Sequence, residues 1–522
     1  MNWLSRIGIL SVLVFLASCA SVQVKPAKSS GIELAAEAWQ RMAQEGADAR
    51  TESSYRQGVA AVLKDLADEG SPNEWPAQIR LSNGWTVRVD SGSTGSHTVW
   101  TPKLFDELQV PRIKPKTDVP GALREGVGLP VDGLRVDEEE DSQSRFVYLG
   151  RQNLPVTAVL EFGGGPKMAT LRLYDPREVQ TVRVGRRSIT LAADFVTSVH
   201  AMLDRRSFVR RALGGLVRPG RFWDDEGLFI QEPYRKDKVP IVFVHGLMSD
   251  PHIWENVIVA IRSDPELSKR VQCWCYMYPS GLPVALSAAR LRQSLQEANK
   301  ILDPENDDAG LNRMMMVGHS MGGLLTRMQV IDSGLDFWNT WFTQPPERVP
   351  LDGESSRMMR SSLLFNANSH VKRVVFIATP HRGSEVADGW IGRLGSKLIR
   401  APMQLVQTLT SLATLDVEMI NPARLEMSRL GANSINGLST KHPVLDVMAK
   451  RPMKAPCHSI IAVVRDKPKL EDTSDGIVPY RSSHLDEAKT EATVKSGHSC
   501  TKKLETVNAV KDLVRRHLFP AR

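Results

Sequence analysis

Motifs for metal and nucleotide binding are missing from this sequence. The 522 residues include five cysteines and 12 scattered histidines, without a His-Glu-x-x-His or Cys-x-x-Cys motif. Structural and catalytic zinc sites use such clusters. The glycine run Gly163 to Pro166 lies between two predicted strands and lacks the Lys-Ser/Thr pair of a phosphate-binding loop, so it predicts a hairpin turn. We therefore expect neither a metal nor a nucleotide cofactor.

Charge of one sign is not in large excess. The chain has 67 basic and 59 acidic residues, a formal net charge of +8. This mild surplus argues against a nucleic-acid-binding protein, which would show a dense basic field. A local basic cluster fits either a solvated helix face or a surface that docks on anionic lipid; it comprises Arg205, Arg206, Arg210, Arg211, Arg218 and Arg221.

The first apolar run, Ile7 to Leu16, is too short to span a bilayer. It follows Arg6 and precedes small residues, which predicts a secretion signal over residues 1–18. The segment Leu16-Ala17-Ser18-Cys19 resembles the bacterial lipobox, which implies that Cys19 becomes a lipidated N-terminus. Ala20 after it implies sorting to the outer membrane, with the body in the periplasm. A plain signal peptide with an incidental cysteine is the alternative.

Four cysteines remain after Cys19, an even number that invites disulfides in an oxidising compartment. Cys457 precedes a predicted strand and Cys500 follows the last one, so we expect them at opposite ends of the sheet, too far apart to bridge. Cys273 and Cys275 alternate on one strand and are expected to be buried thiols.

The first half predicts a β-rich domain over residues 31–225, joined to Cys19 by a polar tether at 19–30. Helical patterning covers 33–68. Short alternating runs then predict strands between 78 and 191, including "SRFVYL" and "PVTAVLEF", and a helix is expected over 192–213. The sequence assigns no chemistry to this domain.

Residues 226–522 change to alternating strands and helices. "VPIVFVHG" at 239–246 is a continuous apolar run, typical of a parallel strand buried on both faces. Later runs such as "VQCWCYMY", "RMMMV", "VKRVVFIA", "HSIIAVV" and "EATVKS" alternate with helical segments. This pattern predicts an α/β fold with a mostly parallel, doubly wound sheet, whose ligands gather at the carboxyl ends of the strands.

A G-x-S-x-G motif lies in this half, with Ser320 at its centre between a predicted strand and helix. That context predicts a nucleophile elbow, which exposes the serine hydroxyl. A serine needs a histidine as base and a carboxylate that orients the histidine. Asp475 and His498 each follow a later strand, so the predicted catalytic residues are Ser320, Asp475 and His498. Asp466 and Asp472 are rival acids; His484 is a less suitable base, and His381 is expected at the rim.

The motifs "HGL", "GHSMGGLL", "ATPHRGS" and "SDGIVP" resemble those of bacterial α/β-hydrolases of the lipase and esterase kind, including the group related to GPI-inositol deacylases. The resemblance covers about residues 227–518 and implies an α/β-hydrolase fold and serine ester hydrolysis. It also implies an oxyanion hole made by the backbone N–H groups of Leu247 and Met321.

Two functions other than ester hydrolysis are possible for this sequence. One is acyl transfer or amide cleavage by the same triad; the other is a non-catalytic envelope-assembly lipoprotein whose N-terminal domain binds a partner.

Two insertions, 332–370 and 383–456, bear on the substrate. The first holds Phe337, Trp338, Trp341 and Phe342, which fit either an apolar lid or packing against the N-terminal domain.

Overall fold

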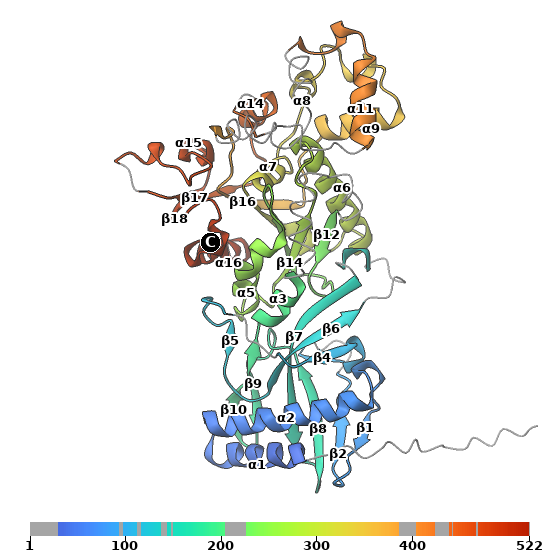
Figure 1. Ribbon diagram of the computed structural model, residues 1–522, viewed down its shortest axis with the longest axis vertical. Helices are drawn as coiled ribbons and strands as arrows, with labels where there is room; N and C mark the ends of the chain where they lie inside the picture. Colours follow the sequence, from blue (N-terminus) through green and yellow to red (C-terminus); the bar gives the residue numbers. More distant parts are fainter. Residues whose placement is uncertain are drawn as a thin grey trace, which may run out of the picture.

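The computed structural model describes residues 30–92, 98–111, 116–136, 144–147, 150–203, 226–385, 403–422, 438–440, 442–465 and 468–520. The predicted leader with Cys19, the basic cluster of Arg205 to Arg221 and the rival acid Asp466 lie outside these residues. In the described ranges, no helix combines the length and apolarity needed to cross a membrane. The molecule is elongated, with the N-terminal elements at one end and α8, α9 and α11 at the other (Figure 1).

The predicted helical region 33–68 consists of two helices, α1 (Ser30–Glu45) and α2 (Ala49–Glu69), which pack against each other. The chain turns between them at Gly46, whose φ of 102° favours glycine. Asp48 then caps α2, because its side chain accepts a hydrogen bond from the Thr51 N–H at 2.8 Å. The sequence pattern did not predict this short turn, because its helical periodicity continues across residues 46–48.

The N-terminal sheet contains seven strands in the order β1-β2-β8-β7-β6-β4, with β3 paired to β8. Two short pairs, β9 with β10 and β5 with β11, lie beside it. The strands are β1 (Gln78–Arg80), β2 (Thr86–Val89), β3 (Val99–Trp100), β4 (Glu107–Gln109), β5 (Leu123–Arg124), β6 (Leu129–Val136), β7 (Arg151–Phe162), β8 (Met168–Tyr174), β9 (Thr181–Val184), β10 (Arg187–Thr190) and β11 (Ala193–Asp194). The predicted hairpin at Gly163 to Pro166 is confirmed, since it joins the antiparallel strands β7 and β8.

One predicted strand of this region is wrong, and the predicted helix starts later than expected. "SRFVYL" contains a 3-10 turn over Ser144–Phe146, and Phe146 is buried against the core of the second sheet. The helix expected over 192–213 begins only at α3 (Val196–Leu203), because Ala193 and Asp194 pair with β5. Asp194 then accepts hydrogen bonds from the N–H groups of Val196 and Thr197, both at 2.9 Å, which starts the helix.

The second sheet confirms the predicted mostly parallel α/β architecture. Its order is β12-β14-β13-β15-β16-β17-β18, and β12 alone is antiparallel within this sheet. The strands are β12 (Gly227–Ile230), β13 (Val239–Val244), β14 (Val271–Met277), β15 (Met314–His319), β16 (Val371–Ile377), β17 (Cys457–Val463) and β18 (Thr490–Lys495). The helices of this half are α5 (Glu255–Arg262), α6 (Val284–Leu302), α7 (Met321–Arg327), α8 (Asp336–Asn339), α9 (Gly353–Leu363), α11 (Met403–Ala413), α14 (Pro443–Lys450), α15 (Tyr480–Ser483) and α16 (Leu504–Leu518).

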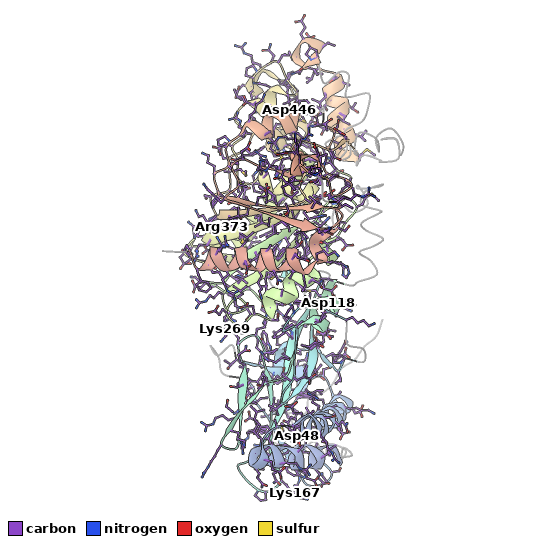
Figure 2. The ribbon with its side chains drawn as sticks, turned by 90° about the vertical axis from the view of Figure 1, so that its left-hand side faces the viewer. Asp48, Asp118, Lys167, Lys269, Arg373 and Asp446 are labelled. Carbon is purple, nitrogen blue, oxygen red and sulfur yellow. The ribbon has the colours of Figure 1, made fainter. Side chains whose placement is uncertain are left out.

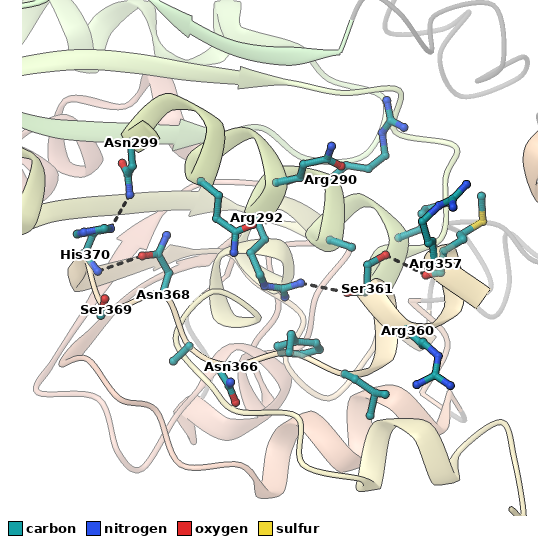
Figure 3. Close-up of a pocket in the computed structure, with 18 of the residues that line it drawn as sticks. Arg290, Arg292, Asn299, Arg357, Arg360, Ser361, Asn366, Asn368, Ser369 and His370 are labelled. Atoms are coloured by element: carbon teal, nitrogen blue, oxygen red, sulfur yellow. Dashed lines mark hydrogen bonds between the residues drawn. The ribbon is translucent and has the colours of Figure 1, made fainter. Parts of the chain in front are cut away.

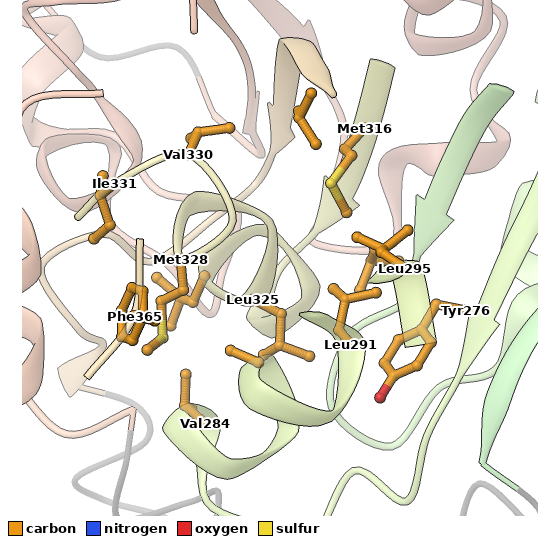
Figure 4. Close-up of a cluster of buried hydrophobic side chains, with 14 of the residues drawn as sticks. Tyr276, Val284, Leu291, Leu295, Met316, Leu325, Met328, Val330, Ile331 and Phe365 are labelled. Atoms are coloured by element: carbon orange, nitrogen blue, oxygen red, sulfur yellow. The ribbon is translucent and has the colours of Figure 1, made fainter. Parts of the chain in front are cut away.

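Two hydrophobic cores cover the two faces of this sheet. Every residue of β13 is buried; Val242 and Val244 join the core beneath α6 and α7, whereas Ile241 and Phe243 join the core beneath α5 and α16. Figure 4 shows part of the first core, where Leu291 and Leu295 of α6 face Leu325 of α7 and Met316 of β15. The continuous apolar run at 239–246 therefore reflects burial on both faces.

A third core belongs to the N-terminal sheet and its two helices and draws on residues between 32 and 191. Helix α3 packs instead in the core of the second sheet through Val196, Val199 and Leu203. Figure 2 shows the two sheets along the long axis, with Asp48 and Lys167 labelled at the N-terminal end. The boundary of a separate N-terminal domain at residue 225 stays a prediction.

Aromatic side chains of the first insertion lie in the core of the second half and not in that of the N-terminal sheet, and a lid function of the insertion stays a prediction. Phe337 and Trp338 are fully buried in the core beneath α6 and α7, and Trp338 stacks on Phe342 with 4.3 Å between ring centroids. The Trp338 indole N–H donates to the carbonyl of Gln344 at 2.8 Å. These aromatic side chains are therefore core residues of the second half. Residues 386–402 and 423–437 of the second insertion lie outside the described ranges.

The four described cysteines are buried free thiols. Cys457 lies in the core beneath α6 and α7, and Cys500 lies in the core on the opposite face of the sheet. Cys273 and Cys275 are both on β14, as expected. The sheet therefore separates Cys457 from Cys500.

Candidate active site

Ser320 occupies a tight turn between β15 and α7. Its backbone angles, φ 53° and ψ −126°, are unfavourable for a residue with a side chain. The turn is held by a 2.9 Å hydrogen bond from the Ser320 N–H to the Ile377 carbonyl of β16, and the Gly323 N–H donates to the Ser320 carbonyl at 2.9 Å. The predicted strand-turn-helix context of the G-x-S-x-G motif is therefore present.

Glycines around Ser320 allow backbone segments to approach one another. A Cβ atom on Gly322 would lie 2.3 Å from the carbonyl oxygens of Val244 and His245, at the end of β13. A Cβ atom on Gly246 would lie 2.9 Å from the Cβ of Ser320. Both distances are shorter than a carbon atom tolerates, so the loop after β13 lies directly against the serine turn.

The structure brings together the three predicted catalytic side chains. His498 Nε2 lies 2.8 Å from Ser320 Oγ, and His498 Nδ1 lies 2.7 Å from Asp475 Oδ2. An ionised carboxylate only accepts hydrogen bonds, so Asp475 favours the tautomer with hydrogen on Nδ1 and leaves the Nε2 lone pair toward the Ser320 hydroxyl. Ser320 and Asp475 are 7% and 4% exposed, so bulk water competes little for these hydrogen bonds.

Two loops place the acid and the base. Asp475 follows β17, and its Oδ1 accepts the N–H groups of Ile477 at 2.8 Å and Val478 at 2.7 Å. His498 follows β18, and its backbone carbonyl lies 2.9 Å from His319 Nε2. The Asp475 side chain is thus fixed by N–H groups of its own loop, and the backbone of His498 is held by the His319 ring of the serine turn.

The rival residues are engaged elsewhere. Asp472 pairs with Arg481 at 2.6 Å, and His484 contacts the carboxylates of Glu491 at 2.7 Å and Asp486 at 3.1 Å. Asp466 is outside the described residues. These partners leave Asp475 and His498 as the acid and base that face Ser320.

The expectation that His381 lies at the rim is wrong. His381 is fully buried, contacts the edge of the Phe376 ring and lies 3.3 Å from the Arg327 guanidinium. Burial, together with the charges of Arg327 and Arg382, holds the pKa of His381 well below its usual value. It is a neutral core residue, placed inward by the turn after β16.

Sequence analysis missed the part that His319 plays. Its ring is buried beside that of His498, with 5.0 Å between centroids, and Nε2 can donate to the His498 carbonyl. Burial, with a smaller contribution from His498, lowers the pKa of His319 to about 3, so the ring is neutral at neutral pH. The only signal was its position directly before the serine.

Leu247 and Met321, the residues expected to form the oxyanion hole, belong to two segments near Ser320. Met321 begins α7, where the N–H groups of the first turn have no preceding helical carbonyl to bind. Leu247 follows Gly246, which packs against the Cβ of Ser320. Both backbone segments are therefore next to the serine, as an oxyanion hole requires.

No group of three His, Cys, Asp or Glu side chains that could hold a metal ion occurs in the described ranges. The residues around Ser320 suit acyl chemistry by proton transfer, because a buried carboxylate, an imidazole and a hydroxyl follow one another at hydrogen-bond distance.

Comparisons with known proteins give distant structural likenesses. No protein-family model matches the chain, and no match is found among curated protein sequences. The chain is similar to the mature form of a lipase from Bacillus licheniformis, with 16% identity over 55% of this chain and 97% of that one, and a TM-score of 0.34. It is also similar to a lipase-esterase related protein from Clostridium acetobutylicum, with 12% identity over 56% and 99% of the two chains and a TM-score of 0.29. A thermophilic esterase from the planctomycete Thermogutta terrifontis gives 12% identity over 56% and 91%, with a TM-score of 0.31.

The close backbone approach at Gly322 predicts a strong effect of one methyl group. Gly322→Ala should lower the free energy of unfolding by about 3 kcal/mol or more, because Cβ would overlap two carbonyl oxygens that cannot move without displacing β13. Urea unfolding followed by circular dichroism measures this. Gly353→Ala is the matched control: its nearest neighbour would be 3.9 Å away, and we expect a change within about 0.5 kcal/mol. Equal midpoints for the two variants would contradict the packing described.

Neutral His319 predicts a pH-dependent contribution to stability. Its native pKa of about 3 lies below the value of about 6.5 expected in the unfolded chain, so between these values the unfolded state binds the extra proton. Stability should therefore fall as the pH drops below about 6.5. Relative to His319→Asn, the wild type should lose about 2 kcal/mol of unfolding free energy between pH 7 and pH 5. Parallel pH profiles of the two proteins in urea unfolding would show that His319 is charged or exposed.

Proposed function

We propose that this chain is a serine hydrolase with an α/β-hydrolase fold that cleaves carboxylic esters through an acyl-enzyme on Ser320. The observation that carries the proposal is the hydrogen-bonded sequence Asp475, His498, Ser320 at the carboxyl ends of β17, β18 and β15. A structural serine would not need a strained turn, an imidazole at hydrogen-bond distance and a buried carboxylate behind it.

Each side chain has a defined task in this reaction. His498 Nε2 removes the Ser320 proton as Oγ attacks the ester carbonyl carbon, and Asp475 stabilises the imidazolium that forms. The backbone N–H groups of Leu247 and Met321 are placed to receive the negative oxygen of the tetrahedral intermediate. His498 then gives its proton to the leaving alcohol, and a water molecule repeats the sequence to release the acid.

The rim of the site supports an apolar acyl group. Met248 and Ile477 are 37% and 39% exposed. Leu247, which precedes Met248 in the sequence, is partly buried. Met248 follows the proposed oxyanion residue, and Ile477 donates to the catalytic carboxylate. Exposed apolar side chains next in sequence to proposed site residues suit a fatty acyl chain or a lipid surface, so we propose esters or lipids as substrates.

The place of action rests on the N-terminal sequence. We propose that Cys19 carries the lipid anchor and that the protein is held at the outer membrane with its body in the periplasm. Acyl chains on the N-terminus would hold the enzyme beside lipid substrates, since each buried CH₂ contributes about 0.8 kcal/mol to membrane binding.

Removing the nucleophile gives the sharpest test of the proposal. Ser320→Ala should abolish labelling by a fluorophosphonate probe and lower kcat for p-nitrophenyl esters by about 10⁴-fold or more. Ser499→Ala is the matched control, because Ser499 is exposed and directly follows His498. Persistent labelling of Ser320→Ala, or unchanged ester cleavage, would refute the proposal. A series of p-nitrophenyl esters of rising chain length, with phospholipids alongside, would identify the preferred acyl group.

The orienting acid has its own test. Asp475→Asn keeps the shape of the side chain but favours the wrong histidine tautomer, so kcat should fall by about 10⁴-fold with normal folding. Asp472→Asn, in the same loop and paired with Arg481, should keep wild-type activity. The reverse order of effects would assign the role to Asp472.

A further inference from the structure

A cavity of about 1040 Å³ lies between α6, α9 and the segment 364–370 (Figure 3). Its volume is at the upper end of the range for small-molecule sites. The proposed catalytic side chains Ser320, Asp475 and His498 do not line it. Its polar lining is dominated by guanidinium and amide groups, from Arg290, Arg292, Asn299, Arg357, Arg360 and Asn368.

Positive charge in this cavity exceeds negative charge. Four arginines and one acid, Glu354, line it. Arg290 pairs with the Glu226 carboxylate. Across the described residues, Arg292, Arg357 and Arg360 form no ion pair with a carboxylate. The Arg360 guanidinium is held by the Pro346 carbonyl at 2.7 Å and lies over the Trp338 ring. Arg292 and Arg357 therefore line the cavity without acidic partners in that part of the chain.

Arg292 is the most constrained of the three. It is 7% exposed, and its guanidinium stacks over the Phe365 ring at 4.0 Å. It donates to the carbonyls of Ser361 at 3.2 Å and Met328 at 3.1 Å, while its Nε has no partner in the described ranges. Burial lowers the pKa of Arg292 to about 10, so it remains a cation at neutral pH. A buried cation without an anion is costly, which favours a negatively charged occupant.

Amide groups lie at the other end of the cavity, near His370 (Figure 3). The Asn299 amide contacts His370 Nδ1, and Asn368 Oδ1 accepts the His370 N–H at 3.0 Å. In the described residues, Asn299 Oδ1 and Asn368 Nδ2 have no hydrogen-bond partner. Both atoms are buried in the wall of the cavity, so they do not face an occupant.

We infer that this cavity is a binding site for a phosphate ester. Arginine is the side chain that best matches the several acceptor oxygens of a phosphate, and four arginines line the site, of which Arg290 is paired with Glu226. This site is separate from the proposed esterase site and does not rest on the esterase proposal. The same chemistry occurs in a free glycerol phosphate and in the headgroup of a phospholipid.

The test is calorimetric titration of the full chain in a nonionic detergent. The probes are sn-glycerol 3-phosphate, for a free ligand, and dihexanoyl phosphatidylglycerol, for a lipid source; glycerol is the control without phosphate. We expect saturable binding of one phosphate probe, and the tighter probe identifies the source. Arg357→Ala removes an exposed guanidinium from the lining and should weaken binding about tenfold.

Matched variants separate a specific site from general charge. Arg88→Ala removes an exposed arginine from β2, far from the lining in sequence, and should bind as the wild type does. Arg292→Lys keeps the charge but loses the planar fork, so it should also bind more weakly. The inference is overturned if neither phosphate probe binds saturably, if glycerol binds equally well, or if Arg88→Ala and Arg357→Ala weaken binding equally.

Discussion

The close approach of three backbone segments around Ser320 is the constraint on which the proposed catalytic site depends. The loop after β13 lies against the serine turn through Gly246 and Gly322, and the end of β16 holds the Ser320 N–H. Side chains at those glycine positions would separate the segments. Because these segments meet at backbone distance, the turn that carries Ser320 has little freedom to move away from the loop after β13.

The sheet order then determines where the acid and base can come from. Strands β15, β16, β17 and β18 are neighbours in that order, so the loops after β17 and β18 reach the serine across the end of β16. Their precision comes from local hydrogen bonds: Asp475 is fixed by two N–H groups, and His498 by the ring of His319. A neutral His319 matters here, because a second charge beside His498 would oppose formation of the imidazolium.

Sequence patterns predicted the second half well because its strands are buried on both faces and its turn motifs need particular residues. They failed where tertiary contacts override local signals. The sequence patterns did not predict strand β6, because it contains Pro130, Asp132 and Gly133. In the structure, Asn153 donates to Asp132 at 2.6 Å and Phe105 fills the space over Gly133. The inward position of His381 and the burial of the aromatic insertion depend on neighbours distant in the chain. Single-sequence patterns do not record such contacts.

Helix α7 links the two proposed sites electrostatically. Ser320 precedes its first residue, and the carbonyl of Met328, its C-cap, accepts a hydrogen bond from Arg292. A cation at a helix C-terminus is favourable, because the last carbonyls have no helical partners and carry partial negative charge. This contact explains why Arg292 can stay charged within the core. It satisfies only part of the guanidinium, however, since Nε has no partner in the described residues. Two neutral carbonyls do not balance a full positive charge, so the cavity beside α6 keeps a net attraction for an anion.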